Sequence, residues 1–417
     1  MKHVIIVSFD LIRHGEPLTS LAIGSMVAYI QSDYRYNELF TLQHIPFNLN
    51  EFNKNLFNDV VISAFKSIQL SEIDTIALSC YIWSEYMINP LSKWLRINGF
   101  SGKIVLGGYQ ISYSSKSNLP AEYPDADIFI LGYAELALLD AILMDKVDGH
   151  PIFIDLAVDF SHVPSPYLQK TITLDETTPN LRIETKRGCP YKCTFCAHRE
   201  LKSNKVYHHT LEKLFAELSL FKSINATKIN VLDPVFNMGK TYLEYLNEIS
   251  NQNMKTAFVF QSRLELIRGL EGITFLDSIQ KINAAIEFGV QSIIPEEYNI
   301  VNRNNDIKQI SESLKSLNDR EINFEISLIY GLPMQTVDSF SKSIDFLIDH
   351  NCKNIKAFPL MLLKGTELFY QKEKYAFIER EMGAFKIPTV VASSTFTENE
   401  WEKMDQIASA LNPTSRY

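Results

Sequence analysis

Three cysteines lie close together near the middle of the chain, at Cys189, Cys193 and Cys196. Their spacing, C-x₃-C-x₂-C, lets three thiolates bind three irons of a [4Fe–4S] cluster and leaves the fourth iron without a protein ligand. An iron with an open position can bind a small molecule and pass an electron to it, whereas a cluster held by four cysteines mainly relays electrons. The motif therefore predicts a cluster that takes part in chemistry.

Two other interpretations of these cysteines are possible, but each has an argument against it. A structural zinc site needs four ligands, usually from two separated pairs, and His198 would have to complete the set in an unusual spacing. A disulfide framework is disfavoured because five cysteines in 417 residues are neither an even set nor a dense one.

Length and composition bound the remaining possibilities. A chain of 417 residues with 46% hydrophobic residues predicts two or three domains with sizeable cores. The formal net charge of −9 argues against a general nucleic-acid-binding surface. No apolar run reaches the roughly 18 residues that a membrane helix needs, and few cysteines fit a reducing compartment. We therefore expect a soluble cytoplasmic protein.

The first part of the chain, residues 1–145, alternates short β-branched runs with helical patterns, which predicts a parallel, doubly wound, Rossmann-like sheet. Ligands of such sheets bind outside the carboxyl ends of the strands. The predicted strands are Val4–Phe9, Phe40–Ile45, Thr75–Ile82, Lys103–Leu106 and Asp127–Leu131, and the predicted helices are Leu18–Ile30, Phe52–Ile68, Met87–Ile97 and Ala134–Met144. A proline-bearing stretch, residues 146–180, is interpreted as a linker.

The second part, residues 181–364, contains six strand–helix units in a row and predicts a partial (βα)₆ barrel with its site at the carboxyl ends of the strands. The cysteine motif follows the first of these strands. The predicted strands are Arg182–Thr185, Lys228–Leu232, Ala257–Gln261, Ala284–Phe288, Phe324–Tyr330 and Asn354–Phe358, and the predicted helices are Leu211–Phe221, Lys240–Ser250, Phe275–Ile282, Lys308–Leu317 and Val337–Ile348. Residues 365–417 form a C-terminal extension, predicted to be a small cap with a helix over Glu398–Leu411.

The barrel and its cysteine motif resemble the radical S-adenosylmethionine (radical SAM) superfamily. The resemblance implies that S-adenosylmethionine binds the open iron and is cleaved to a 5′-deoxyadenosyl radical. It places Phe195, the aromatic residue of C-x₃-C-x-Φ-C, beside the adenine.

Later strand ends carry the same resemblance. Ile286–Ser292 is similar to an "iEiGvQS" motif, followed by Asn302-Arg303 in place of an "NR" pair, and Leu328–Pro333 is similar to "lIyGlP". The resemblance assigns cofactor contacts to residues at the ends of the second to fifth strands. They are Asp233, Gln261, Arg263, Gln291, Ser292, Arg303 and Gly331, with Gln261 standing where relatives often have Glu.

In the first part, Lys103–Gly108 is similar to a "kvvlGG" strand and loop, and Asp127–Glu135 is similar to "D.iv.GegE", with Tyr133 and Ala134 departing from it. The first part thereby resembles the cobalamin-binding domain that is fused to many radical SAM enzymes. The segments that carry this resemblance imply corrin contacts at Gly107, Gly108, Gly132 and Glu135. Asp10–Gly15 lacks the D-x-H-x-x-G spacing, so no histidine of that motif reaches cobalt. Another interpretation is a Rossmann-like domain that reads a different ligand.

Taken together, the resemblances imply a cobalamin-dependent radical SAM methyltransferase that acts on an unactivated carbon, or on phosphorus, of a peptide or small metabolite. Its cofactors would be a [4Fe–4S] cluster, S-adenosylmethionine and cobalamin, and a flavodoxin or ferredoxin would supply electrons. The alternatives are radical SAM rearrangement, oxidation or cyclisation with the same domains, and a non-catalytic iron–sulfur redox or binding protein.

Overall fold

The computed structural model describes residues 1–51, 60–146, 149–175, 177–198, 205–239 and 241–411. The chain divides into two compact units, Met1–Pro179 and Asn180–Tyr417. None of the described helices is long and apolar enough to cross a membrane.

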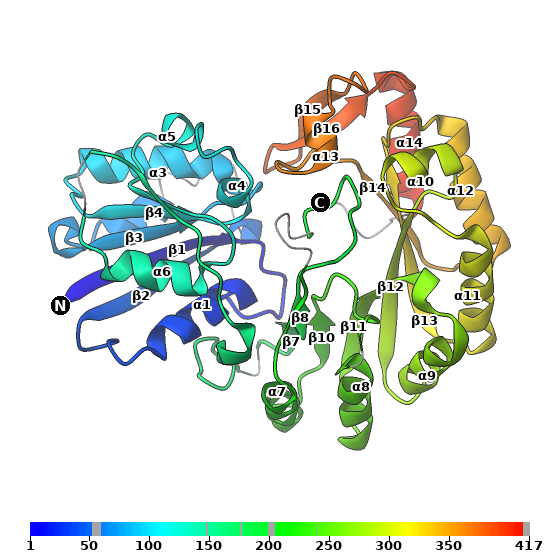
Figure 1. Cartoon of the computed structure of the whole chain (residues 1–417), viewed down its shortest axis with the longest axis horizontal. Coiled ribbons are helices and arrows are strands. Elements are labelled where there is room, and N and C mark those ends of the chain that lie inside the picture. Colours follow the sequence, from blue (N-terminus) through cyan, green and yellow to red (C-terminus); the bar gives the residue numbers. More distant parts are fainter. Residues whose placement is uncertain (52–59, 147–148, 176, 199–204, 240, 412–417) are drawn as a thin grey trace. The chain divides into compact units, whose positions relative to one another are not determined.

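The first unit is a doubly wound parallel sheet, as predicted, with six strands where five were predicted, in the order β2-β1-β3-β4-β5-β6. Figure 1 shows α1 and α6 on one face of this sheet and α3 on the other. The strands are β1 (Lys2–Asp10), β2 (Phe40–Asn48), β3 (Thr75–Ser79), β4 (Lys103–Gly107), β5 (Ile128–Ile130) and β6 (Ile152–Ile154). The helices are α1 (Leu21–Gln31), α2 (Ile62–Phe65), α3 (Glu85–Ile97), α4 (Tyr109–Ser112), α5 (Leu119–Glu122) and α6 (Ala134–Leu143), with 3₁₀ turns at Leu49–Glu51, Leu70–Glu72 and Phe160–His162.

Strand order in this unit changes direction between β1 and β3, because the chain first adds β2 on one side of β1 and then β3 to β6 on the other. In doubly wound sheets a ligand binds at the carboxyl ends of the strands beside such a switch point. Apolar side chains on one face of the strands, such as Val4 and Ile6, form the core with apolar side chains of α1 and α6, such as Val27 and Leu138.

The stretch predicted as a linker belongs to the first unit. Ile152–Ile154 pairs in parallel with β5 and extends the sheet by one strand. Further along, Ile172 packs so closely on α1 that a Cβ at Gly24 would lie 2.4 Å from its Cγ1, and Thr171 donates a hydrogen bond to the Gly24 carbonyl. The strand Ile152–Ile154 stands in a proline-bearing stretch without the strand–helix alternation that predicted the other strands of this sheet.

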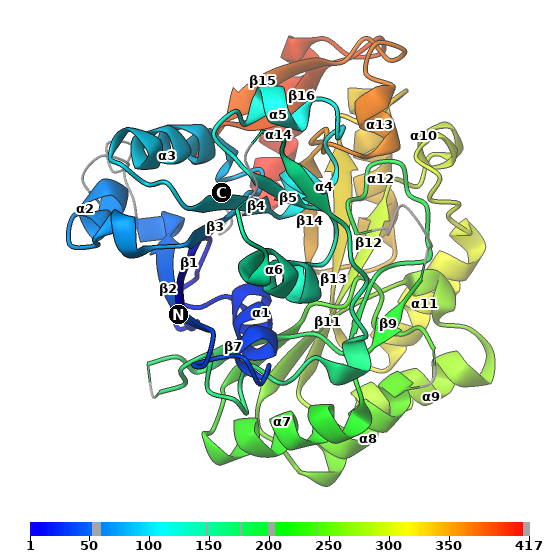
Figure 2. The same ribbon diagram turned by 60° about the vertical axis from the view of Figure 1, so that its left-hand side comes forward.

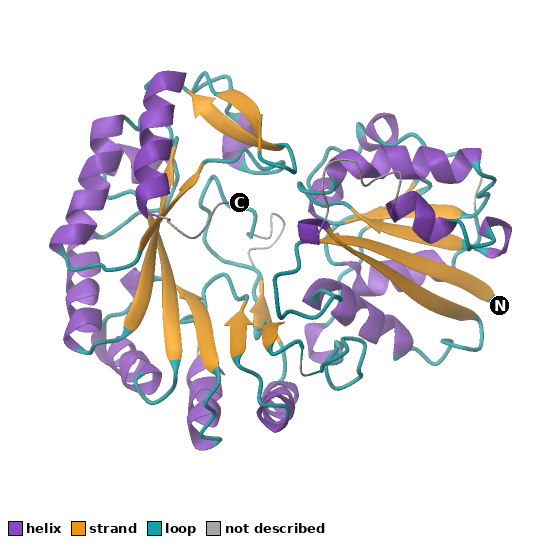
Figure 3. Cartoon of the chain, turned by 180° about the vertical axis from the view of Figure 1, so that it is seen from behind, coloured by secondary structure: helices purple, strands orange, loops and turns teal. Residues whose placement is uncertain are grey.

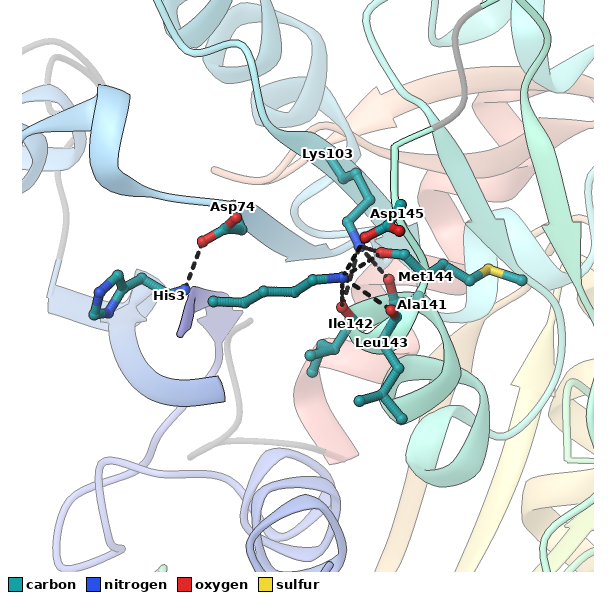
Figure 4. Close-up of polar contacts among 9 residues, drawn as sticks. His3, Asp74, Lys103, Ala141, Ile142, Leu143, Met144 and Asp145 are labelled. Atoms are coloured by element: carbon teal, nitrogen blue, oxygen red, sulfur yellow. Dashed lines mark hydrogen bonds and ion pairs between the residues drawn. The ribbon is translucent and has the colours of Figure 1, made fainter. Parts of the chain in front are cut away.

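Two lysines, Lys2 and Lys103, bind the last carbonyls of α6 at the amino-terminal edge of the first sheet; Lys103 is labelled in Figure 4. Lys103 Nζ, which is buried, donates to the carbonyls of Ala141 at 2.6 Å and Ile142 at 3.2 Å. Lys2 Nζ donates to Leu143 O at 2.9 Å. Cations at a helix C-terminus satisfy its unpaired carbonyls and interact favourably with its dipole, so these contacts fasten α6 to the sheet.

The second unit contains the predicted partial barrel. Six parallel strands stand side by side in the order β14-β13-β12-β11-β10-β7, and Figure 3 shows helices covering their outer side. The strands are β7 (Asn180–Ile183), β10 (Lys228–Val231), β11 (Ala257–Ser262), β12 (Ala284–Gln291), β13 (Asn323–Tyr330) and β14 (Ile355–Pro359), with a short antiparallel pair formed by β8 (Lys186–Arg187) and β9 (Tyr207–His208). The helices are α7 (Leu211–Ser223), α8 (Thr241–Asn251), α9 (Gly269–Ile279), α10 (Pro295–Ile300), α11 (Ile307–Asp319) and α12 (Val337–Asp349), with a 3₁₀ turn at Leu264–Leu266.

Elements of the predicted cap divide between two roles. Helix α14 (Glu398–Leu411) packs on β13 and β14 as the last covering helix of the barrel, and Tyr330 donates a hydrogen bond to Asp405 at 2.6 Å. Helix α13 (Glu367–Tyr370) and the antiparallel strands β15 (Ile378–Met382) and β16 (Ile387–Ala392) are inserted between β14 and α14 (Figure 2). The tail is therefore partly a cap and partly the sixth helix of the barrel. Two predicted helices, Phe52–Ile68 and Lys240–Ser250, overlap positions 52–59 and 240, which lie outside the described residues.

Candidate functional site

The cysteine segment begins at a hairpin directly after β7. Gly188 turns the chain at φ +91°, and a Cβ there would lie 2.3 Å from the carbonyl oxygen of Lys205, which precedes β9. Only glycine fits such a position. Cys189 and Cys193 are buried and Cys196 is half-buried, with the Cys196 N–H donating to the Cys193 carbonyl at 3.2 Å. The hairpin thus presents the three thiols at the carboxyl end of the first barrel strand.

Two other parts of the unit hold this segment in place. The Thr194 N–H donates to Val301 O at 3.0 Å, and the Leu368 N–H donates to Thr194 O at 3.1 Å. Asn302 Nδ2 donates to Lys192 O at 3.0 Å. The segment is therefore clamped between the turn after α10 and the start of α13.

Burial favours the neutral form of two of these thiols, Cys189 and Cys196. Burial raises the pKa of Cys196 to about 11 and also raises the pKa of Cys189. The guanidinium groups of Arg263 and Arg303 act in the opposite direction on Cys189. Metal ligation requires thiolates, so binding a cluster here would release protons, and the two arginines would help to hold the resulting negative charge.

Among the described residues, no group of three or more His, Cys, Asp or Glu side chains could hold a metal ion together. A tetrahedral zinc ion needs such a group, because its ligands surround one point. A [4Fe–4S] cluster does not, because each of its thiolates binds a different iron.

Arg263 follows β11 and lies against the cysteine segment. Its guanidinium stands 3.8 Å from the centroid of the ring of Tyr191, the residue that lies between Cys189 and Cys193 in the sequence. Its Nη2 donates to Glu265 Oε1 at 3.0 Å and to the Arg303 carbonyl at 3.2 Å. These contacts fix a buried positive charge beside the thiols.

Arg303 contributes the second guanidinium. Its Nη2 donates to the Gly289 carbonyl at the end of β12, and its Nε is buried without a hydrogen-bond partner in the described part of the chain. A buried donor without a partner is costly, and a planar guanidinium is well suited to a carboxylate. The residue therefore fits the carboxylate of an amino acid group.

The turns after β12 and β13 both use unusual backbone angles. Gln291 has φ +71° within a β-bulge, and a Cβ at Gly289 would lie 2.3 Å from Gln291 Nε2. Gly331 has φ +87°, and its N–H donates to Gln335 Oε1 at 2.6 Å. Bulges and glycines at strand ends let the backbone approach a ligand closely.

Two of the residues predicted to bind the cofactor, Asp233 and Ser292, are fully buried and hydrogen-bonded to other residues of the second unit. Asp233 has no exposed surface, and its Oδ1 accepts hydrogen bonds from the backbone N–H groups of Thr185 at 2.7 Å and Lys186 at 3.2 Å. Ser292 is also fully buried and donates to Glu297 Oε2 at 2.6 Å. Asp233 orients the start of the cysteine hairpin, and Ser292 fixes the turn after β12.

The remaining predicted residues of the second unit stay accessible. Gln261 is exposed on β11 opposite Glu287, and Phe195 is half-buried within the cysteine segment. The structure therefore brings Arg263, Arg303 and the cysteines together at one edge of the barrel. Sequence reasoning missed Tyr191, the stacking partner of Arg263, although its place between Cys189 and Cys193 was a usable signal.

The first unit presents glycines at the carboxyl ends of β4 and β5. Gly108 has φ +104°, and a Cβ there would lie 2.6 Å from the Cys80 carbonyl. Gly132 has φ +89° with no atom closer than 3.9 Å to the position of a Cβ, and Gly107 has none closer than 3.6 Å. The turn at Gly108 is closed by the Cys80 backbone, whereas Gly107 and Gly132 leave room for a ligand against the backbone, which fits the edge of a corrin. Glu135 is buried in the first turn of α6.

Comparison with known proteins adds to this geometry. Residues 183–347 match the profile of the radical SAM superfamily. The chain is 22% identical over 390 residues to the cobalamin-dependent radical SAM methyltransferase TokK of Streptomyces tokunonensis, covering 84% of this chain and 54% of that protein. It is 23% identical over 331 residues to 2-(S-pantetheinyl)-carbapenam-3-carboxylate methyltransferase of Streptantibioticus cattleyicolor, covering 72% of this chain and 48% of that protein. The chain thus spans about half the length of these curated relatives.

Solved structures share the fold of both units. The structure of OxsB with aqua-cobalamin and S-adenosylmethionine bound has a TM-score of 0.68 at 16% identity, covering 99% of this chain and 67% of that one. The structure of TsrM from Kitasatospora setae with cobalamin and a [4Fe–4S] cluster bound has a TM-score of 0.69 at 12% identity, covering 99% of this chain and 89% of that one. At these identities the likeness concerns the fold.

Proposed function

Because the second unit of this chain contains a radical SAM domain over residues 183–347, we propose that the protein is a cobalamin-dependent radical SAM methyltransferase. The observation that carries the proposal is the cysteine hairpin at the end of β7, with the buried guanidiniums of Arg263 and Arg303 beside it. The similarity to methyltransferases such as TokK extends over 84% of the chain and supports the same assignment.

Three cofactors belong to the proposal. Cys189, Cys193 and Cys196 would hold a [4Fe–4S] cluster, and the turns of Gly107, Gly108 and Gly132 would hold cobalamin. When bound, the cluster supplies the electron that cleaves S-adenosylmethionine to a carbon radical, and cobalamin supplies the methyl carrier.

The chain's own residues position S-adenosylmethionine and neutralise its charge. Arg303 Nε, which is buried and has no partner among the described residues, can receive the methionyl carboxylate, and Gly289 and Gly331 let the nucleoside lie against the backbone. Gln291 and Gln261 offer amides to the ribose, and the half-buried ring of Phe195 offers a surface to the adenine. Arg263, held by Tyr191 and Glu265, balances the thiolate charge.

The proposed substrate is a small metabolite or a peptide, and the atom that is methylated is an unactivated carbon or a phosphorus. A flavodoxin or ferredoxin in a reducing compartment such as the cytoplasm would supply electrons. Methyl transfer is favoured over rearrangement, oxidation or cyclisation because TokK and the carbapenam-carboxylate enzyme are both named as methyltransferases.

Anaerobic reconstitution with iron, sulfide and hydroxocobalamin tests the proposal. We expect about four irons and one cobalt per chain, and dithionite-dependent formation of 5′-deoxyadenosine and S-adenosylhomocysteine from S-adenosylmethionine. Deoxyadenosine without S-adenosylhomocysteine or cobalt would indicate another radical reaction. Iron without any cleavage would indicate a redox or binding protein and overturn the assignment.

A further inference from the structure

A buried carboxyl group connects the two turns that follow β12 and β13. Glu297, in the short helix α10, has no exposed surface. Its Oε2 accepts hydrogen bonds from Ser292 Oγ at 2.6 Å and from Gln335 Nε2 at 3.1 Å, and its Oε1 accepts one from Ser339 Oγ. Ser292 belongs to the first turn and Gln335 to the second, whereas Ser339 lies in the first turn of α12, which follows the second.

Gln335 carries the connection onward to the backbone. Its Oε1 accepts hydrogen bonds from the N–H groups of Gly331 at 2.6 Å and Leu332 at 3.2 Å, and its Nε2 also donates to Ile329 O at 3.1 Å. A single carboxyl group therefore joins the end of β12 to the glycine turn after β13 through one intervening side chain.

The surroundings of Glu297 suit an ionised carboxylate. All three side-chain partners act as donors, and an ionised carboxylate is an acceptor only. Ser339 is the N3 residue of α12, whose N-cap is Thr336, so the carboxylate also lies near the positive end of a 13-residue helix. Burial raises the pKa of Glu297 above its ordinary value, and the hydrogen bonds from Ser292, Ser339 and Gln335 offset only part of that rise.

We propose that Glu297 is a positioning residue, which holds the Gln291–Ser292 turn and the Gly331–Gln335 turn in the arrangement that binds S-adenosylmethionine. The proposal rests on the proposed function for the identity of the ligand. Gln291 at φ +71° has a backbone conformation that is costly for a residue other than glycine, so it depends on outside contacts. Gly331 at φ +87° has one of several conformations that glycine adopts readily, so outside contacts must select it. Glu297 reaches both.

The test replaces Glu297 by its isostere, Glu297→Gln. An amide NH₂ would face at least one of the three donors and leave a buried group without an acceptor. In the unliganded protein we expect amide hydrogen exchange to accelerate about tenfold in both turns, at 289–294 and 331–335. In the reconstituted protein we expect the dissociation constant for S-adenosylmethionine, measured by anaerobic equilibrium dialysis, to rise about tenfold with iron content unchanged.

Two further variants separate positioning from general stability. Glu217→Gln removes another buried carboxylate of the same unit, on α7, and should leave exchange in both turns and the S-adenosylmethionine affinity unchanged. Ser339→Ala should show a smaller version of the Glu297→Gln effect, and Ser339→Thr, which keeps the hydroxyl, should restore the wild-type values.

Each outcome bears on the proposal. Unchanged exchange in either turn of Glu297→Gln overturns it, as does an equal loss of affinity in Glu217→Gln. If the wild-type protein binds no S-adenosylmethionine, the proposed function fails. Coupled acceleration of exchange in the two turns would then still establish the connection through Glu297, without its ligand.

Discussion

The carboxyl edges of the two sheets differ in what they offer a ligand. In the first unit the edge consists mainly of backbone, because glycines follow two of the strands. Gly107 and Gly108 lie at the end of β4, and Gly132 lies between β5 and α6, with few side-chain atoms near any of them. In the second unit the edge carries buried thiols and two guanidiniums, around Cys189, Arg263 and Arg303. The first edge can accept a broad ligand by shape, and the second selects a small charged one by its charges.

Replacement of a cysteine should separate the two edges most clearly. Cys193→Ala removes one thiolate of three, and we expect cluster affinity to fall at least about 100-fold and deoxyadenosine formation to fall with it. Cobalt content should stay at the wild-type level. Cys352→Ala, a buried thiol of the same unit, is the control and should retain both metals. Retention of full iron content in Cys193→Ala would refute the cluster assignment.

A glycine of the first edge should give the reciprocal result. Gly132→Ala adds a methyl group where the backbone has φ +89°, and we expect cobalamin affinity to fall about tenfold while iron content is unchanged. Gly99→Ala has nearly the same angle, φ +88°, with no atom within 4 Å of the new Cβ, so it controls for backbone strain. Equal cobalt loss in both variants would assign the effect to strain. Cobalt is measured after anaerobic reconstitution and desalting.

The opposite edge of the first sheet should affect stability alone. Lys103→Met removes the ammonium group that binds the last carbonyls of α6, and we expect the free energy of unfolding of the first unit to fall by about 2–3 kcal/mol. Lys146→Met, which removes a partly exposed lysine that donates to Ser101 O, should change it by less than about 1 kcal/mol. Urea unfolding of the apo protein gives both values. An unchanged or raised stability in Lys103→Met would show that burying this charge offsets its hydrogen bonds.

The smallest expected effect is a pH dependence confined to the first unit. Burial lowers the pKa of His44 to about 4, and both ring nitrogens contact hydroxyls, at Ser8 and Thr19. The unfolded chain therefore takes up a proton near pH 6.5, before the folded one does. The contribution of neutral His44 to the free energy of unfolding is therefore fully present above pH 6.5 and is lost as the pH falls towards 4. The loss is about 2 kcal/mol between pH 6.5 and 5. His44→Gln should flatten the dependence of urea midpoints in this range, and an unflattened profile would locate the proton uptake elsewhere.

Much of the fold could be predicted from local patterns. The six barrel strands and α14 follow from apolar periodicity, since each is long enough to show a period. Strand β6 has the same three residues as β5, Ile-Phe-Ile, but β5 leads into the helical pattern of α6, whereas no helical pattern follows β6, and β6 was therefore not predicted. Strands β15 and β16 were missed within the tail, where β15 buries none of its residues and so lacks the alternation of a half-buried strand.

The candidate site was predicted less completely, because a motif gives a residue's place in the chain and not its partners. Asp233 and Ser292 match positions of ligand contacts in the resembled motifs, yet their oxygens are bonded to the hairpin and to Glu297. Glu297 itself lies in a short helix with no motif of its own. Its role depends on Gln335 and Ser339, which are 38 and 42 residues further along the chain.

The position of α14 has a consequence for synthesis on the ribosome. Residues 398–411 cover the outer face of β13 and β14, which are themselves made some 40 to 75 residues earlier. Domains generally fold as units, in order of emergence. The first unit, whose residues end at Pro179, can fold while the barrel is still being translated. The last barrel strands must instead wait with an apolar face uncovered until α14 emerges, and we expect nascent chains that stop before residue 398 to be the ones that recruit chaperones.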